Sequence, residues 1–284
     1  MKNKYCKALI STPLVALAML ADVATAGTTE TMAPAPAPAP AEDVVSGVLK
    51  LDFNSHFISY GNDVWSDGNP QFGETNFNPM LELAFALPAG FKATLGTWWD
   101  VTDKGTSGAI GGNLREVDVW GGLAYTYDKF TAGVVFQNWF YGASGAPDKS
   151  EEILDVNFSY DCFLKPTLTV HNRLGAGASG GDEGTILVAG ISHSIEAGPV
   201  TISFPLNVAY FVTDEFHGPT GDSGFGYASI GMGASLALTE VIGESFGDWT
   251  LNGGVAYFFT NDQITVNNGE DNFLTASLGL ALAF

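Results

Sequence analysis

The C-terminal end of the chain alternates strictly between two kinds of side chain. Apolar residues occupy one parity and small or polar residues the other: Leu274, Ala276, Leu278, Leu280, Leu282 and Phe284 against Thr275, Ser277, Gly279, Ala281 and Ala283. Because successive side chains of a strand point to opposite faces, this pattern predicts a strand with one apolar face. Such a strand fits a membrane β-barrel, in which the apolar face meets lipid. Taken alone, it also fits the last strand of a soluble sandwich.

The same alternation recurs along the chain in twelve segments of about ten residues, the length that a tilted strand needs to cross a membrane. The predicted strands are residues 48–60, 79–87, 91–101, 115–127, 130–141, 151–160, 167–174, 185–195, 200–211, 227–238, 249–259 and 273–284.

The connections between these segments alternate in length. Long polar stretches follow the odd-numbered segments, whereas short turns such as residues 88–90 and 128–129 follow the even-numbered ones, with residues 239–248 as an exception. Short turns on one side and long loops on the other are typical of an outer-membrane barrel, and a soluble sandwich has no reason to sort its loops. The sequence therefore predicts an all-β, transmembrane, antiparallel up-and-down barrel of about 12 strands. Its short turns would be periplasmic, its long loops extracellular, and its last strand would pair with its first.

The composition agrees with a barrel and excludes several other classes. Mean hydropathy is slightly positive at +0.15, yet after the first residues no apolar run reaches the ~18 residues of a spanning helix. The formal net charge is −20 and basic residues are scattered, so nucleic acid is not an expected partner. Cys162 is the only cysteine after the N-terminal segment, which leaves no internal disulfide and no thiolate metal site. We expect no metal and no cofactor.

The N-terminal part of the chain divides into two segments before the strands begin. Residues 1–26 combine three lysines, a short apolar core and a small-residue ending, which predicts a cleaved secretory signal peptide. Residues 27–43 contain an Ala-Pro repeat that cannot pack a core, and we expect a disordered periplasmic tether. Residues 44–284 then form the barrel.

The last eight residues resemble the C-terminal recognition signal of bacterial outer-membrane proteins. The matching positions are Ser277, Gly279, Leu282 and Phe284, although Leu282 stands where that signal prefers an aromatic residue. The resemblance implies handling by the barrel assembly machinery and a location in the lipid of the outer membrane of a Gram-negative-type bacterium.

A second resemblance covers much of residues 48–211. Ser-Asp-Gly-Asn-Pro at residues 66–70, Gly-Thr-Trp at 96–98 and Arg-Glu-Val-Asp-Val at 115–119 are similar to segments of the TorF-type family of predicted porins. That family is largely uncharacterised. The resemblance therefore implies location and architecture more than substrate, and it brings no catalytic residues with it.

Charged and polar residues share the parity that faces the lumen. The candidate pore-lining residues are Lys50, Asp52, Glu82, Lys92, Asp100, Glu116, Asp118, Asp155, His171 and Arg173. Acids predominate among them, and charge on a pore lining sets ion preference, so a water-filled lumen with this lining would favour cations. In the alternative, these charges pair across a narrow, plugged lumen and hold the wall together.

Three tryptophans form a candidate aromatic cluster in the lumen. Trp98, Trp120 and Trp139 share the inward parity on three neighbouring strands, toward the long-loop end. A sugar or nucleoside could stack on them. The same residues also fit the packing of a plug beneath the loops, or a local β-bulge that reverses the parity.

The histidines do not suggest an enzyme, and we predict none. His193 and Ser194 are adjacent, so on a strand they point to opposite faces, and neither His56 nor His171 has a serine at a suitable spacing. The sequence thus predicts a porin-like outer-membrane channel for passive diffusion of small solutes, mildly cation-preferring. The alternative is a non-conducting structural or interaction barrel, and the oligomeric state stays open.

Overall fold

The computed structural model describes residues 44–64, 75–102, 112–141, 150–175, 183–212, 223–243, 245, 247–265 and 271–284. The predicted signal peptide (residues 1–26) and tether (residues 27–43) lie outside these ranges, as do residues 66–70 and His217. No helix in the described ranges is long and apolar enough to span a membrane.

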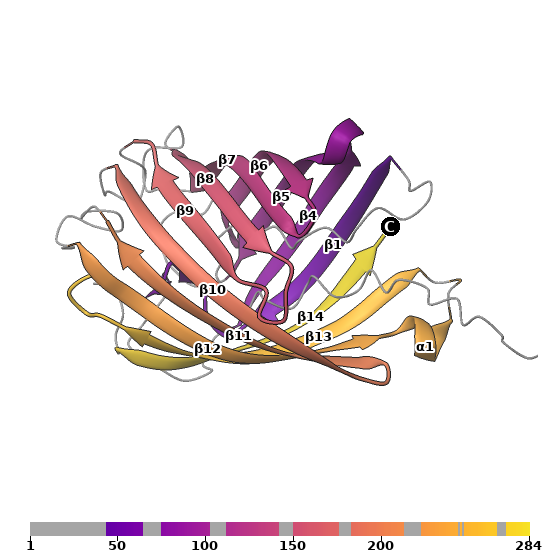
Figure 1. The fold of residues 1–284 in the computed structure, drawn as a ribbon. Coiled ribbons are helices and arrows are strands. Elements are labelled where there is room, and N and C mark those ends of the chain that lie inside the picture. Colours follow the sequence, from indigo (N-terminus) through magenta and orange to yellow (C-terminus); the bar gives the residue numbers. More distant parts are fainter. Residues whose placement is uncertain are drawn as a thin grey trace, which may run out of the picture.

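Twelve antiparallel strands form a closed barrel, which confirms the predicted fold class (Figure 1). They follow one another around the wall in chain order, and β14 closes the barrel on β1 as predicted, with Lys50 opposite Ala281. The strands are β1 (Val45–Asn54), β4 (Asn76–Ala86), β5 (Phe91–Val101), β6 (Leu114–Tyr127), β7 (Phe130–Tyr141), β8 (Ser150–Tyr160), β9 (Thr167–Arg173), β10 (Gly184–Ala197), β11 (Val200–Phe211), β12 (Gly224–Ala237), β13 (Asp248–Thr260) and β14 (Asn272–Ala283).

Short connections join the strands at one end of the barrel. Asp128 has a φ of 53° in the predicted two-residue turn between β6 and β7. The 3-10 turn η2 (Pro88–Gly90) links β4 to β5. The longer connection after β12 contains a single helical turn, α1 (Thr239–Ile242), which accounts for the exception in the predicted loop lengths.

The outer face of the barrel is apolar. Ile230, Met232, Leu95 and Leu278 are each more than half exposed, and all four belong to the parity predicted to face lipid. Exposed aromatic residues occur near both strand ends: Tyr125, Tyr127, Phe130 and Tyr160 near the short turns, and Trp99, Phe140, Tyr210, Tyr257 and Phe259 near the long loops. An apolar band between two aromatic girdles is the exterior expected of a barrel in a bilayer.

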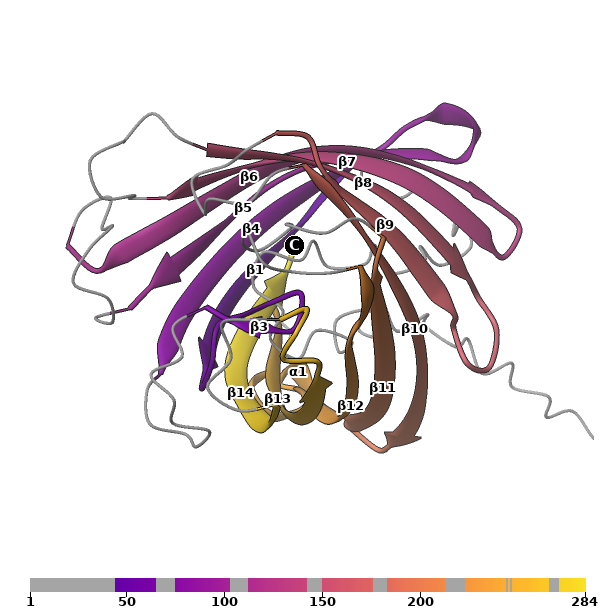
Figure 2. The same cartoon turned by 90° about the vertical axis from the view of Figure 1, so that its left-hand side faces the viewer.

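The first predicted strand is wrong beyond Asn54, because the chain leaves the wall there and turns into the barrel. Ser55 makes the last wall contacts, donating its backbone N–H to Ala276 O (2.9 Å) and accepting from Ala276 N (2.8 Å) at its hydroxyl. Two short strands follow, β2 (Ile58–Ser59) and β3 (Asn62–Asp63). We call residues 55–64 the lumen hairpin, and it lies within the ring of strands in Figure 2.

The turn of the lumen hairpin has the backbone form of a tight two-residue hairpin. Tyr60 and Gly61 both have positive φ, 48° and 81°, as a type I′ turn requires. Gly61 is also needed sterically, because a Cβ there would lie 2.5 Å from the ring of Tyr227. Tyr60, the last residue of the first predicted strand, is only 1% exposed inside the barrel.

Apolar side chains from the wall pack around the lumen hairpin. They come from the ends of β7, β8 and β10–β14 that adjoin the long loops, and the cluster comprises Ile58, Tyr60, Trp139, Ile153, Ile186, Ala209, Phe211, Tyr227, Ala256, Phe258, Ile264 and Phe273. Stacked rings such as Phe258 and Phe273, with centroids 5.3 Å apart, belong to it. The barrel thus contains a packed core in the half of its lumen next to the long loops.

Candidate pore lining and its contacts

The candidate pore-lining residues fall into two groups by burial. Asp52, Glu82 and Lys92 are partly exposed. The others are almost completely enclosed: Lys50, Asp100, Glu116, Asp118, Asp155, His171 and Arg173. Of the enclosed group, all except Lys50 lie on the halves of β5, β6, β8 and β9 that adjoin the long loops, at the level of the packed core.

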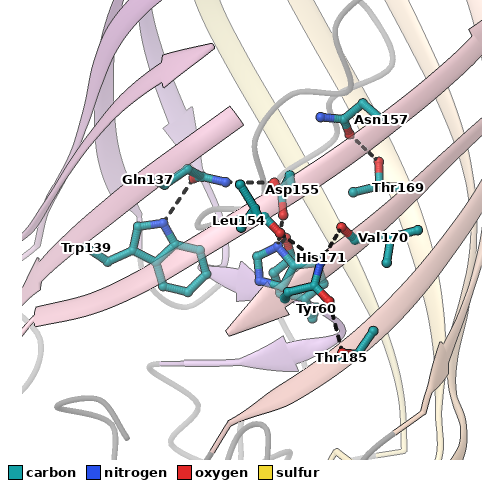
Figure 3. Close-up of polar contacts among 11 residues, drawn as sticks. Tyr60, Gln137, Trp139, Leu154, Asp155, Asn157, Thr169, Val170, His171 and Thr185 are labelled. Carbon is teal, nitrogen blue, oxygen red and sulfur yellow. Dashed lines mark hydrogen bonds and ion pairs between the residues drawn. The ribbon is translucent and has the colours of Figure 1, made fainter. Parts of the chain in front are cut away.

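A buried polar network joins the wall to the lumen hairpin (Figure 3). His171 Nδ1 lies 2.5 Å from Asp155 Oδ1, and since a carboxylate only accepts, the ring N–H donates to it. The hydroxyl of Tyr60 contacts the same nitrogen. Gln137 Nε2 donates to the other oxygen of Asp155 (2.7 Å), and Gln137 Oε1 accepts from Trp139 Nε1 (3.1 Å). Four side chains from three wall strands thus form one network, which reaches the hairpin through the contact of His171 with Tyr60.

The Tyr60 phenol keeps its proton in this network. Burial, and next the nearby Asp155 carboxylate, raise the pKa of the phenol well above its ordinary value. Ionising it would place a second negative charge beside a buried carboxylate, which the low local dielectric makes costly. The hairpin contact therefore does not depend on pH in the physiological range through this residue.

A buried ion pair lies close to this network. Arg173 Nη2 donates to Glu151 Oε1 at 2.5 Å, and the two side chains are 0% and 1% exposed. The pair joins β9 to β8 inside the barrel. It neutralises one acid and one base of the wall, so neither contributes an open charge to the lumen.

A group of three carboxylates lies on β5 and β6. Asp100 stands directly opposite Glu116 across the strand pair, and Asp118 follows on the same face of β6. Asn78 Nδ2 donates to Asp100 Oδ1 at 3.1 Å, and Asn78 Oδ1 accepts from Asn54 Nδ2 at 2.8 Å. In the described part of the chain, Glu116 Oε1 and Oε2 and Asp118 Oδ1 are buried without a hydrogen-bond partner.

The three lumen tryptophans do not form one cluster. Trp98 packs on Phe57 of the lumen hairpin, with ring centroids 5.3 Å apart, and Trp139 lies over His171 at 5.6 Å. Trp120 instead donates its Nε1–H to Glu82 Oε2 (2.9 Å) on β4. The register of β5 and β6 shifts only at Asp100, beyond the tryptophans, so no bulge reverses their inward parity.

The residues of the candidate assembly signal lie at the barrel seam. Gly279 faces Asp52 of β1, and a Cβ at Gly279 would lie 1.8 Å from Asp52 Oδ1. Phe284 exchanges backbone hydrogen bonds with Gly47, and its ring covers that glycine. Ser277 is opposite Asn54, and Leu282 is opposite Leu49.

Several residues of the inner wall were missing from the sequence-based set. Glu151 and Gln137 share the inward parity of their strands, so the alternation itself could have identified them. Phe57 could not have been found in this way, because it continues the apolar parity of Leu49, Leu51 and Phe53. In the described ranges, no group of three or more His, Cys, Asp or Glu is arranged to hold a metal ion.

Comparisons with known proteins return similar folds but no family. No protein-family model matches the sequence, and no curated protein matches it. The TorF-type resemblance therefore stays a prediction. Among solved structures, the NanC porin has 12% identity and a TM-score of 0.45 over 84% of this chain and 98% of its own. The KdgM porin has 9% identity and a TM-score of 0.44 over 84% and 99%.

The translocator domain of the autotransporter NalP from Neisseria meningitidis is also similar, with 12% identity and a TM-score of 0.41 over 86% of this chain and 90% of that domain. At these TM-scores the assignment of the barrel rests on its own strand pairing, described above.

Proposed function

We propose that the chain is a porin-like outer-membrane barrel that passes small solutes passively and prefers cations. The observation that carries the proposal is the division of the wall into two faces. The outer face is apolar with aromatic residues at both ends, and the inner face carries polar and charged side chains beside the apolar cluster around the lumen hairpin. A barrel with this division is built to lie in lipid and to enclose a polar lumen.

The proposed cation preference follows from the charges on the inner face. Inward carboxylates outnumber inward bases among the described residues: Asp52, Glu82, Asp100, Glu116, Asp118, Glu151 and Asp155 against Lys50, Lys92 and Arg173. Arg173 is already paired with Glu151. Charged side chains that line a pore attract the opposite ion, so the remaining acids favour cations.

The same proposal includes where the protein is located and what handles it. The predicted signal peptide would direct the chain out of the cytoplasm and be cleaved. The C-terminal signal would deliver it to the barrel assembly machinery, and outer-membrane lipid would surround the apolar belt. Handling of this kind predicts that the C-terminal Phe284, which is 61% exposed at the seam, contributes to recognition before the barrel closes.

A second candidate function is a non-conducting barrel with a structural or interaction role. The lumen hairpin and its apolar cluster favour it, because Phe57, Ile58 and Tyr60 are each at most 1% exposed inside the barrel. A plug of this kind is one of the known ways in which the interior of such barrels is filled. The two candidates differ in whether ions pass the hairpin.

Planar-bilayer recording of the refolded protein tests the proposed function. We expect stepwise channels whose reversal potential in a salt gradient indicates cation preference. The double variant Asp100→Asn, Asp118→Asn should lower that preference, because it removes two of the buried inner acids. Protein that inserts into the bilayer without producing steps would refute the channel, and an unchanged reversal potential in the variant would refute this assignment of the selective residues.

A further inference from the structure

One row of inward side chains crosses three neighbouring strands and alternates aromatic and acidic groups. Trp98 of β5 pairs in register with Asp118 of β6, and Asp118 pairs with Trp139 of β7. Residues directly opposite each other on one face of a sheet have their Cβ atoms about 4.5–5.5 Å apart. The register therefore places one carboxylate between two indoles.

A second carboxylate adjoins this row. Glu116 lies two residues before Asp118, hence on the same face of β6. Both are nearly inaccessible, with Glu116 1% and Asp118 3% exposed. Three of their oxygens, Glu116 Oε1 and Oε2 and Asp118 Oδ1, are buried without a hydrogen-bond partner in the described residues. Two adjacent buried carboxylates repel each other when both are ionised, so they either share a proton or take up a cation. This pair is therefore suited to a cationic ligand that replaces the shared proton.

The nearest donors of the wall are engaged elsewhere. Arg115 Nε donates to the backbone oxygen of Thr102 at 3.3 Å, and Arg173 pairs with Glu151. Asn78 donates to Asp100. Among the described residues, no ion pair is made with Glu116 or Asp118. Within the described wall, Glu116 and Asp118 interact with each other and with neighbouring acids, so no positive group of that wall compensates them.

The chemistry of the site selects one kind of cation. A primary ammonium group has three N–H donors on a compact positive charge, which matches the three acceptor oxygens. The neighbouring indoles offer apolar surface and a negative ring face, which attract an alkylated cation more than a bare one. Glu116 and Asp118 belong to no group of three or more described His, Cys, Asp or Glu arranged to hold a metal ion.

We propose that Glu116 and Asp118 bind the ammonium group of a primary alkylamine, with the indoles of Trp98 and Trp139 against its alkyl chain. The proposal deepens the proposed channel function, on which it rests for the route by which the amine enters. It assigns a solute class to a lumen that otherwise shows only a preference for positive charge.

Ligand-observed NMR titration of the refolded full chain in detergent micelles tests the proposal. The probe is n-butylammonium at neutral pH. Its neutral counterpart n-butanol tests the need for charge, and tetramethylammonium, which has no N–H, tests the need for donors. We expect saturable binding of n-butylammonium alone. Asp118→Asn should weaken it by at least about tenfold, the scale for removing one partner of a buried charge pair, and Trp98→Leu by about threefold or more.

Glu196→Gln is the matched control for loss of one acid, because that side chain is exposed at the short-turn end of β10. Binding that persists in this variant and fails in Asp118→Asn supports the site. Equal binding of n-butylammonium and tetramethylammonium, unchanged binding in Asp118→Asn, or no binding of n-butylammonium would each overturn it. Binding in micelles does not require conduction, so a barrel without channel steps would refute the proposed function while leaving this result intact.

Discussion

Close packing inside the barrel depends on single positions where a neighbouring side chain leaves room only for a small residue. Gly96 of β5 is one of them, because the Trp120 indole crosses it to reach Glu82 on the next strand. A Cβ at Gly96 would lie 2.2 Å from two atoms of that ring. The absence of a side chain at one position thus permits a hydrogen bond between the two strands on either side of β5.

The substitution Gly96→Ala should destabilise the barrel by about 1–3 kcal/mol, the usual cost of forcing extra volume into a packed interior. The indole must move and lose its bond to Glu82. Urea titration followed by tryptophan fluorescence measures the effect. At Gly253, by contrast, a Cβ would meet its nearest neighbours at 3.6 and 3.7 Å, so Gly253→Ala serves as the control. Equal stability of the two variants would contradict the predicted crowding.

Breaking the buried ion pair of Arg173 and Glu151 should lower the stability of the barrel. Arg173→Met removes the ion-pair partner of the buried Glu151 carboxylate, and we expect a loss of about 3–5 kcal/mol in the free energy of unfolding. Adding Glu151→Leu removes that carboxylate, so the double variant should recover part of the loss. A double variant that is less stable than Arg173→Met alone would mean that the charge of Glu151 is compensated by another group.

At the scale of whole elements, the strands were largely predictable and the lumen hairpin was not. β5, β7 and β11 begin and end at the predicted residues, because alternation and the flanking turns define a strand locally. β1 was predicted to continue to Tyr60, since Phe57 keeps the apolar parity of Phe53. What ends β1 at Asn54 is the packing of the following residues against β9 and β12, which are distant in sequence and leave no local signal.

The contacts of the inward side chains were also not predictable from the sequence. Alternation places Asp118 and Asp155 on the inward face, but it cannot distinguish a carboxylate bonded to His171 from one without a partner. That difference depends on which side chains the register brings together and on what the hairpin covers. The single sequence signal of the hairpin turn is Gly61, which follows an aromatic residue and precedes Asn62 and Asp63.

The hairpin should be held in place by a few contacts. Tyr60→Phe removes the hydroxyl that contacts His171 but leaves the ring, which packs on the imidazole with centroids 3.9 Å apart. Limited proteolysis at the hairpin should therefore be faster in Tyr60→Phe, since a lost hydrogen bond to a buried partner costs about 1–3 kcal/mol of local stability. Tyr257→Phe, on the outer face, should leave the rate unchanged. Equal rates in all three proteins would argue that the hydroxyl does not anchor the hairpin.

For the molecule as a whole, the apolar exterior is energetically favourable only in a bilayer. Ile230 is 54% exposed at the middle of β12. Ile230→Arg should cost roughly 2–4 kcal/mol of folding stability in lipid vesicles if the side chain faces the bilayer midplane. On a soluble protein, an exposed substitution of this kind usually changes stability by less than about 0.5 kcal/mol. Folding titrations into vesicles distinguish the two, and a negligible effect would contradict a lipid-facing belt.

The most direct test of the account is whether the lumen hairpin narrows the channel. It compares two proteins in planar bilayers. One is the refolded barrel, and the other carries Phe57→Ser with Tyr60→Ser, which removes the two large rings of the lumen hairpin. We expect small conductance steps from the unmodified barrel and larger steps from the variant, because the two rings occupy the lumen and are each 1% exposed. Steps of equal size, or none from either protein, would contradict the account.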